Sequence, residues 1–306
     1  VTLPGFIHDT HATAVVHLQG HPLLKNDELG LKSKFGLKFV YPDSSFMTIF
    51  DDGDTLACFF DLDRTCAEIA RFSQKDADAY RSMAKFMASL GPMISMSMAA
   101  PPVQFGRFVS FLEQSDIGEE MLMAMMRSSY DLIVERFEHT KVRLHFLKWM
   151  AEMSCSPEEK TTGMTLLFLI YSSHNNPAGC VVGGTIELTN AMIRCIEHHG
   201  GTVRVNCGVR KIINTGGIAR GVELEDGSTL MAKKAVVAAI HPHDLGDMVP
   251  GLDAGLVDRA RKKEQSTYGG VLINAALKEA PVWKAGKQPE DCLCVNYVDY
   301  TSFEDF

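Results

Sequence analysis

Apolar residues in the stretch 182–245 follow first a helical and then a strand-like spacing. Five apolar side chains recur at helical spacing: Ile186, Leu188, Met192, Ile193 and Ile196. It predicts an amphipathic helix that Gly200 and Gly201 would end. Four β-rich runs follow: Thr202–Asn206, Val209–Ile213, Gly221–Leu224 and Ala235–Ile240. Because the last run is apolar throughout, we expect a strand that is covered on both faces.

Before this stretch, the pattern changes from strands to helices. Three strand-like runs come first, with a tight turn at residues 51–54 before the third: Leu37–Tyr41, Phe46–Phe50 and Thr55–Phe60. Apolar residues then recur at helical spacing over residues 62–98 and 103–149. Ser156, followed by Pro157 and two glutamates, predicts the start of a further helix, because these residues suit a helix N-terminus.

After this stretch, the pattern predicts two short helices and two strands. The helices are expected at residues 241–244 and 256–264, and the strands at 269–277 and 293–297. A chain of 306 residues has room for two domains. The whole pattern therefore predicts a mixed α/β (α+β) protein with a large helical insertion.

Composition and charge narrow the functional classes. The formal net charge of -8, without a basic cluster, argues against a nucleic-acid partner, because phosphate binding needs positive charge. Eight cysteines without CxxC pairing indicate free thiols in a reducing intracellular compartment, either the cytoplasm or an organelle matrix. No apolar run reaches the ~20 residues that a membrane-spanning helix needs.

No catalytic group stands out by spacing alone. The sequence has no GxSxG, HExxH or P-loop motif and no GxGxxG after a strand, so the catalytic residues stay unknown. His8, His11, His17 and His21 match no zinc-binding spacing, so we expect no metal site. The methionine-dense region at 93–126 favours a helix core over a lipid or polyene pocket, and membrane-surface contact is a weaker expectation.

Residues 183–242 resemble the middle segment of the phytoene desaturase-like flavoprotein oxidoreductases. These are relatives of carotenoid desaturases and isomerases and of pyridine nucleotide-disulfide oxidoreductase domain-containing protein 2. The family pattern falls on Gly183, Gly184, Gly200, Gly201, Val209, Gly221, Val222, Asp226, Gly227, Val236, Val237 and Ala239. The opening "PGFIHDTHAT" is similar to the family's "GF.FD.G" segment beside the flavin. It matches at Gly5, Phe6, Asp9 and Thr10, with His11 where a glycine is common.

The resemblance implies FAD as cofactor and part of a Rossmann-like FAD-binding domain with a large inserted substrate domain of sheet plus helices. The residues that it implies for FAD binding are Asp9, Thr10, Gly183, Gly184, Val209 and Ala239. It implies flavin-domain segments at 1–20 and 179–250, a largely helical substrate or cap domain at 21–178, and a return to the substrate-domain sheet at 251–306. The family's N-terminal dinucleotide motif and C-terminal FAD segment have no counterpart in the sequence. We therefore expect a truncated or split chain, or one that has lost flavin binding.

Two functions fit these expectations. The first is an FAD-dependent oxidoreductase, or part of one, that acts on an apolar small molecule by hydride transfer to or from flavin. The alternative is a non-catalytic binding or interaction subunit on a degenerate flavoprotein scaffold, and either a homo-oligomer or a complementary chain would fit it. His174 and His241 are the histidines nearest the implied flavin, although a structural role is favoured for both.

Overall fold

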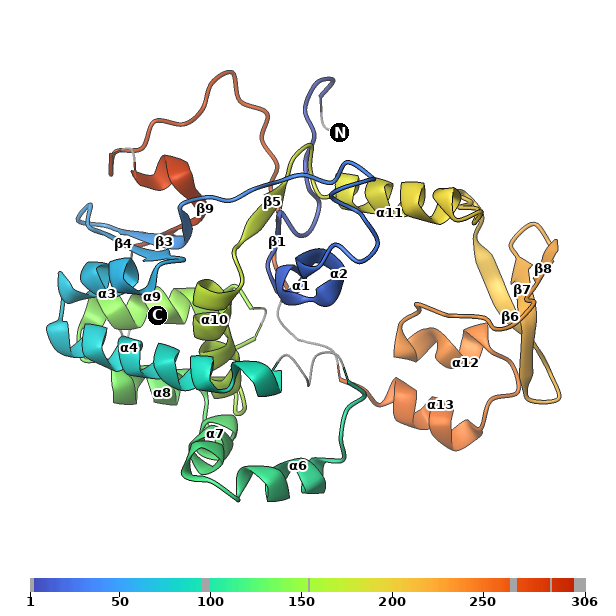
Figure 1. Ribbon diagram of the computed structural model, residues 1–306, viewed down its shortest axis with the longest axis horizontal. Helices are drawn as coiled ribbons and strands as arrows, with labels where there is room; N and C mark the ends of the chain where they lie inside the picture. Colours follow the sequence, from blue (N-terminus) through green and yellow to red (C-terminus); the bar gives the residue numbers. More distant parts are fainter. Residues whose placement is uncertain (1–2, 95–99, 154, 265–268, 287, 300–306) are drawn as a thin grey trace. The chain divides into compact units, whose positions relative to one another are not determined.

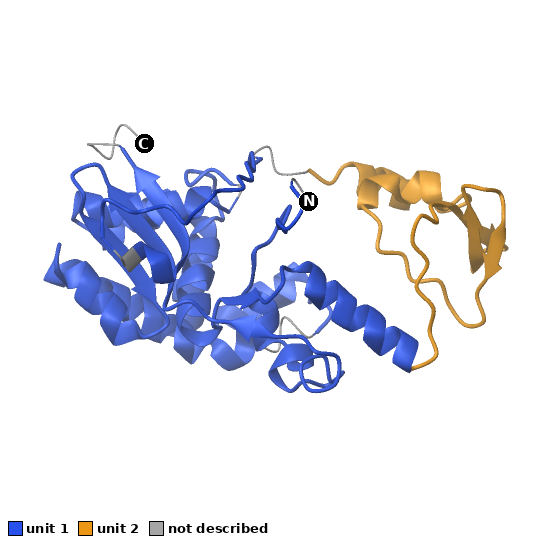
Figure 2. Ribbon diagram, turned by 90° about the horizontal axis from the view of Figure 1, so that it is seen from above, with its two compact units in different colours: residues 1–198, 267–306 blue, residues 199–266 orange. Residues whose placement is uncertain are grey.

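The computed structural model describes residues 3–94, 100–153, 155–264, 269–286 and 288–299. The chain forms two compact units, which are coloured separately in Figure 2. The first comprises residues 1–198 and 267–306, and the second comprises residues 199–266. Both units combine helices with strands, which confirms the mixed α/β class predicted from the sequence.

The main sheet of the first unit has β3 (Ser44–Phe50) at its centre, between β4 (Thr55–Phe59) and β9 (Cys292–Val298) (Figure 1). β3 and β4 form an antiparallel hairpin across the turn predicted at residues 51–54. β9 runs parallel to β3, although most of the chain separates the two strands. The structure confirms the predicted strands at all three places.

In the part of the first unit that the structure describes, helices pack in one large core with β3 and β4. They are α3 (Leu62–Ala70), α4 (Gln74–Ser89), α6 (Phe105–Leu112), α7 (Asp116–Met126), α8 (Ser129–Arg136), α9 (Thr140–Ala151) and α10 (Gly163–Asn175). The largest buried side chains of this core include Tyr80, Phe137 and Phe146. The structure therefore confirms the helical region that the periodicity predicted.

Serine side chains divide this region into shorter helices than the pattern predicted. The hydroxyls of Ser73, Ser115 and Ser128 each accept a hydrogen bond from a backbone N–H in the first turn of the next helix. Because such a capping residue has an extended backbone, it separates its helix from the preceding one. Residues 95–99, at the end of the helical run predicted at 62–98, lie outside the described residues.

A second sheet of the first unit brings the N-terminal segment next to the chain before residue 182. β1 (Ala14–Val15) and β2 (Phe39–Val40) pair antiparallel on the two sides of β5 (Gly179–Val181). The short helices α1 (His17–Gly20) and α2 (Pro22–Lys25) follow β1. This arrangement joins sequence segments that lie far apart along the chain.

α11 (Ile186–His198) follows β5 and confirms the helix predicted from the apolar spacing. It ends just before Gly200, which has a φ of +79°. Such a left-handed glycine commonly ends a helix. The buried side of α11 belongs to a smaller core of Leu24, Leu31, Leu37, Val181, Ala191 and Cys195.

The second unit contains an antiparallel sheet in the order β6-β7-β8. β6 (Val209–Thr215) and β7 (Ile218–Leu224) confirm two predicted strands, and β8 (Thr229–Met231) pairs with β7. The 3-10 helix η1 and two α-helices follow, close to the predicted places: η1 (Pro242–Asp244), α12 (Leu245–Met248) and α13 (Ala254–Arg261).

Three predicted strands, at 202–206, 235–240 and 269–277, are absent from the described residues. The expectation that residues 235–240 are covered on both faces is wrong, because Val237 is 94% exposed. Val271 is similarly 91% exposed. A strand needs a neighbouring strand for its backbone hydrogen bonds, and none of the described strands pairs with these segments. Apolar composition alone was therefore an insufficient signal.

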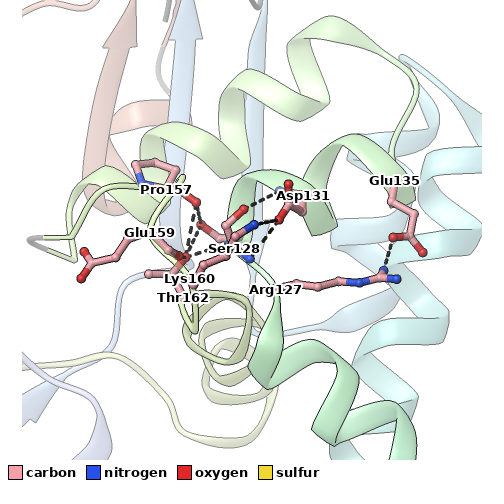
Figure 3. Close-up of polar contacts among 9 residues, drawn as sticks. Arg127, Ser128, Asp131, Glu135, Pro157, Glu159, Lys160 and Thr162 are labelled. Carbon is pink, nitrogen blue, oxygen red and sulfur yellow. Dashed lines mark hydrogen bonds and ion pairs between the residues drawn. The ribbon is translucent and has the colours of Figure 1, made fainter.

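The helix predicted to begin at Ser156 begins instead at Gly163. The Pro157 carbonyl accepts the Tyr130 N–H at 2.9 Å and the Ser129 hydroxyl at 3.0 Å. These bonds attach the loop to the first turn of α8 (Figure 3). A carbonyl at the start of a helix would instead accept an N–H four residues later in its own helix. The tertiary contact therefore overrides the local helix-start signal.

Asp131 ties the same loop to α8 and gives a pH-dependent prediction. Its carboxylate accepts hydrogen bonds from Lys160 Nζ at 2.9 Å and from the Ser128 N–H at 3.2 Å (Figure 3). The Lys160 contact first, and then Ser128, lower the pKa of Asp131 from 3.8 to about 2. Because the folded state favours the ionised form, this stabilisation is complete above about pH 4 and is lost as the pH falls towards about 2.

We expect Asp131→Asn to lower the free energy of unfolding at pH 7 by about 0.5–1 kcal/mol, a small effect because the carboxylate is well exposed to solvent. Urea denaturation between pH 7 and pH 2.5 measures it, and the difference from the wild type should shrink below about pH 4. Glu158→Gln in the same exposed loop is the control. A loss for Asp131→Asn that stays constant over this pH range would contradict the assignment.

Candidate functional site

In the first unit, the N-terminal segment around Asp9 lies against the start of the segment 183–242, both of which resemble a flavoprotein family. Asp9 and Thr185 are 176 positions apart in the sequence, and Asp9 Oδ1 accepts both the Thr185 N–H at 2.8 Å and its hydroxyl at 2.7 Å. Thr185 directly precedes α11. Asp9 therefore satisfies a backbone donor that the start of the helix would leave free.

Gly183 and Gly184 allow this close approach. Their φ angles are +88° and +90°, which side-chain-bearing residues rarely adopt. A Cβ atom at Gly184 would lie 3.2 Å from Ile7 Cγ2 and 3.3 Å from Asp9 Oδ1. At Gly183, a Cβ atom would meet only Glu187 Cγ, at 3.1 Å. Gly184 is thus required by the packing of the N-terminal segment, whereas Gly183 is exposed.

The structure brings together three of the six residues predicted to bind the cofactor: Asp9, Gly183 and Gly184. Thr10 follows Asp9, is exposed, and contacts the His11 ring through its hydroxyl at 3.0 Å. Val209 begins β6 and Ala239 lies in an exposed extended segment, and both belong to the second unit. The role of all six in binding a cofactor stays a prediction.

An apolar pocket of about 420 Å³ opens beside the N-terminal segment, three residues after Asp9. Its walls come from the N-terminal segment, β3, α9, α10 and β9, and include Ala12, Phe46, Trp149, Leu169 and Cys294. The ring of Phe46 stacks on that of Trp149, with centroids 5.0 Å apart. Its size and largely apolar lining are typical of a small-molecule site.

This pocket could not be predicted from the sequence. Its walls come from five elements scattered along the chain, so no local motif marks them. The apolar residues at helical spacing in α9 and α10 were the only signal, and that signal predicts a helix core equally well. The pocket therefore becomes visible only in the folded chain.

Few polar groups line this pocket. Ser172 is 2% exposed, and its Oγ has no hydrogen-bond partner among the described residues. Burial of an unsatisfied hydroxyl is unfavourable, so Ser172 is suited to a polar atom of a ligand. Desolvation lowers the pKa of His17, whose ring packs 5.0 Å from that of Phe168, so its imidazole is neutral at pH 7. Burial raises the pKa of the Cys294 thiol, which therefore stays protonated.

Two other histidines have structural partners. His174 Nδ1 donates to the Phe60 carbonyl at 3.1 Å, which leaves Nε2 to accept the Tyr80 hydroxyl at 2.7 Å. Burial lowers the pKa of His174. His145 is fully buried between Thr48 and Cys58, and desolvation lowers its pKa to about 3. Both rings are therefore neutral at pH 7 and hold elements of the core together.

The described residues also bear on three other features: metal binding, disulfides and membrane-spanning helices. These residues hold no group of three or more His, Cys, Asp or Glu side chains that could bind a metal ion. All eight cysteines are free thiols. In the ranges that the structure describes, no helix has both the length and the apolar character that crossing a membrane requires.

Comparison with known proteins relates the chain to flavoproteins. The sequence pattern of one family, described as flavin-containing amine oxidoreductases, matches residues 5–297. A 4,4'-diapophytoene desaturase from Methylomonas sp is 24% identical over 253 residues, which are 82% of this chain and 48% of the relative. A phytoene desaturase from Cercospora nicotianae is 24% identical over 238 residues, 76% of this chain and 35% of the relative. The chain thus spans about half the length of these curated relatives, or less.

Comparison with solved structures also relates the fold of this chain to that of other proteins. Two structures of putrescine oxidase variants superpose with TM-scores of 0.51 and 0.52 and sequence identities of 13% and 14%. Each alignment covers 85% of this chain and 54% of the other. At such low identity the likeness concerns the fold alone. It agrees with the flavoprotein fold predicted from residues 183–242.

Proposed function

Because this chain belongs to the family of flavin-containing amine oxidoreductases, we propose that it forms part of an FAD-dependent oxidoreductase that acts on an apolar small molecule by hydride transfer. Membership of the family confirms the resemblance to flavoprotein oxidoreductases predicted from the sequence. The observation that carries the proposal is the contact between Asp9 and Thr185. It joins the two flavin-related segments at the side of an apolar pocket.

Asp9, Thr10, Gly183 and Gly184 of the first unit are the proposed cofactor contacts of that unit. Val209 and Ala239, in the second unit, are proposed as cofactor contacts on the resemblance alone. The exposure of Gly183 supports this assignment, because a residue without Cβ lets a flat cofactor approach the chain closely. FAD, when bound, takes up or gives the hydride. The proposed flavin-domain segments are 1–20 and 179–250, and the proposed substrate-domain segments are 21–178 and 251–306.

The chain itself would orient the substrate and exclude water. The stacked rings of Phe46 and Trp149, with Leu169, supply an apolar wall of the pocket. Such a wall favours an apolar substrate, because transfer of apolar surface out of water is favourable by about 25 cal/mol per Å². The neutral His17 ring and the protonated Cys294 thiol add no charge to this wall.

Flavin titration tests the proposed function. The chain, extended at both ends by the dinucleotide motif and the C-terminal FAD segment of the family, should take up added FAD, retain it through gel filtration and show flavin absorbance. FMN is the matched control, because it lacks the adenylate for which Val209 and Ala239 are proposed as partners. We expect FAD to bind at least about tenfold more tightly than FMN, roughly 1.4 kcal/mol. Equal binding of the two flavins would contradict the assignment of Val209 and Ala239.

A chain that takes up neither flavin would instead favour the second candidate, a binding subunit on a flavoprotein scaffold. Consecutive exposed apolar side chains support this candidate, since Val271, Leu272 and Ile273 are 91%, 56% and 84% exposed. Apolar surface of this kind is typical of a region that another polypeptide covers. A complementary chain or a second copy are the proposed partners in that case.

A further inference from the structure

Two pockets of the first unit share part of their walls. The apolar pocket and a second pocket of about 380 Å³ are both lined by His17 and Asn176. His17 begins α1, and Asn176 directly follows α10 (Figure 1). Lys25, at the end of α2, lines the second pocket only. A ligand that passes between His17 and Asn176 would therefore contact an apolar pocket on one side and a cation on the other.

Three donors around this shared wall, from Lys25, Asn176 and Ser172, have no side-chain partner among the described residues. Lys25 makes no ion pair, and the side-chain amide of Asn176 no hydrogen bond, with any part of the chain that the structure describes. The buried Ser172 hydroxyl is likewise unsatisfied within the described residues. An ammonium, an amide N–H and a hydroxyl can all donate to the same kind of oxygen atom.

The charges in the two pockets also favour an anion at this wall. Lys25 supplies a positive charge in the second pocket. Glu152 is the carboxylate on the apolar pocket, and it pairs with Lys148 at 3.4 Å. The walls also hold His17 and His21, neither of which is an anion in any protonation state, and the Cys294 thiol, which stays protonated.

We infer that the substrate is an amphipathic carboxylate whose apolar body fills the 420 Å³ pocket and whose carboxylate lies at the wall formed by His17 and Asn176. Ser172 and Asn176 donate hydrogen bonds to the carboxylate, and Lys25 attracts it from the second pocket. That this ligand is a substrate rests on the proposed function, whereas its binding does not. A purely hydrocarbon ligand would leave the buried Ser172 hydroxyl unsatisfied.

The test uses the flavin-free chain, so a failure to bind FAD does not affect it. Trp149 lines the apolar pocket, and in a Trp283→Phe background it is the single tryptophan that reports ligand binding by fluorescence. The probes are decanoate and 1-decanol, which share a ten-carbon body and differ in the charged end. Decanoate should bind about tenfold more tightly at low salt, and only its affinity should fall as the salt concentration rises.

Variants separate the roles of the donors. Lys25→Gln should weaken decanoate binding about three- to fivefold, as for an exposed ion pair, and leave 1-decanol unchanged. Ser172→Ala should weaken decanoate binding by about fivefold or more, because a buried hydrogen bond to a charged group is lost. Lys38→Gln is the matched control, since Lys38 is exposed and lines neither pocket.

Three results would overturn the inference. They are equal affinity for decanoate and 1-decanol, an equal effect of Lys25→Gln and Lys38→Gln, and no binding of decanoate. Flavin uptake with any of these results would leave the proposed oxidoreductase standing and remove only the carboxylate substrate. Decanoate binding without flavin uptake would keep the carboxylate site and remove the proposed oxidoreductase.

Discussion

Replacement of Asp76 by alanine is expected to lower the free energy of unfolding by about 3–4 kcal/mol, because it leaves two backbone donors without their acceptor. Asp76 lies in the first turn of α4 and is completely buried. Its two carboxylate oxygens accept the N–H of Glu138 at 2.8 Å and the N–H of His139 at 2.9 Å. These residues directly precede α9, so Asp76 fixes the start of that helix against α4.

Urea denaturation measures this effect as a lower midpoint with an unchanged m-value. Asp78→Ala is the matched control, because Asp78 lies in the same helix, is exposed, and contacts only Gln74 through its side chain at 3.0 Å. The control should cost less than about 0.5 kcal/mol. Asp76→Asn should be intermediate, since the amide keeps one acceptor oxygen. Equal losses for Asp76→Ala and Asp78→Ala would rule out a special role for Asp76.

The second large effect is expected for Gly184→Val. At a φ of +90°, valine is strained, and its side chain would push against Ile7 and Asp9. We expect the two hydrogen bonds between Asp9 and Thr185 to break and flavin affinity to fall at least about tenfold, roughly 1.4 kcal/mol. Flavin titration measures the affinity, and hydrogen exchange at the Thr185 amide reports the broken bond.

Gly53→Val separates backbone strain from crowding. Gly53 has a φ of +87°, nearly that of Gly184, but a Cβ atom there would meet nothing within 4 Å. Both variants should lose about 1–3 kcal/mol of stability from the strained backbone. Only Gly184→Val should speed exchange at Thr185 and weaken FAD. If Gly53→Val weakened FAD as much, the contact at Gly184 would have no specific role.

The parts of the fold that could be predicted are those whose signal is local. α11 was predicted from apolar spacing and a glycine stop, and the strands β6 and β7 from β-rich runs. Both signals arise from residues that contact each other within a short segment. The structure therefore agrees with the sequence at these elements.

The errors arise where a distant contact decides the local structure. Residues 235–240 have the composition of a buried strand, yet no described strand pairs with them. Ser156 and Pro157 have the composition of a helix start, yet the Pro157 carbonyl bonds to α8. The segment itself shows neither that residues 235–240 lack a partner strand nor that Pro157 bonds to α8, because hydrogen bonds between distant residues leave no periodic pattern.

Some residues of the candidate site could likewise be predicted from the sequence, and others could not. The resemblance singled out Asp9, Gly183 and Gly184, which the fold brings together. The pocket residues Ser172 and Trp149 carried no such signal, since neighbours in their own helices would be equally suitable by residue type. A pocket is a property of the surfaces between elements, so its residues emerge only when those elements are packed.

The parallel pairing of β3 with β9 sets an order for events during synthesis. Residues 51–291 must leave the ribosome before the third strand of this sheet can add to the hairpin of β3 and β4. Contacts between such distant segments form slowly, because a long loop has to close first. The second unit, encoded within this interval, can complete its own sheet earlier. Until β9 arrives, one side of β3 has unpaired backbone groups, so a nascent chain stalled before residue 292 should depend on chaperones more than one released after residue 298.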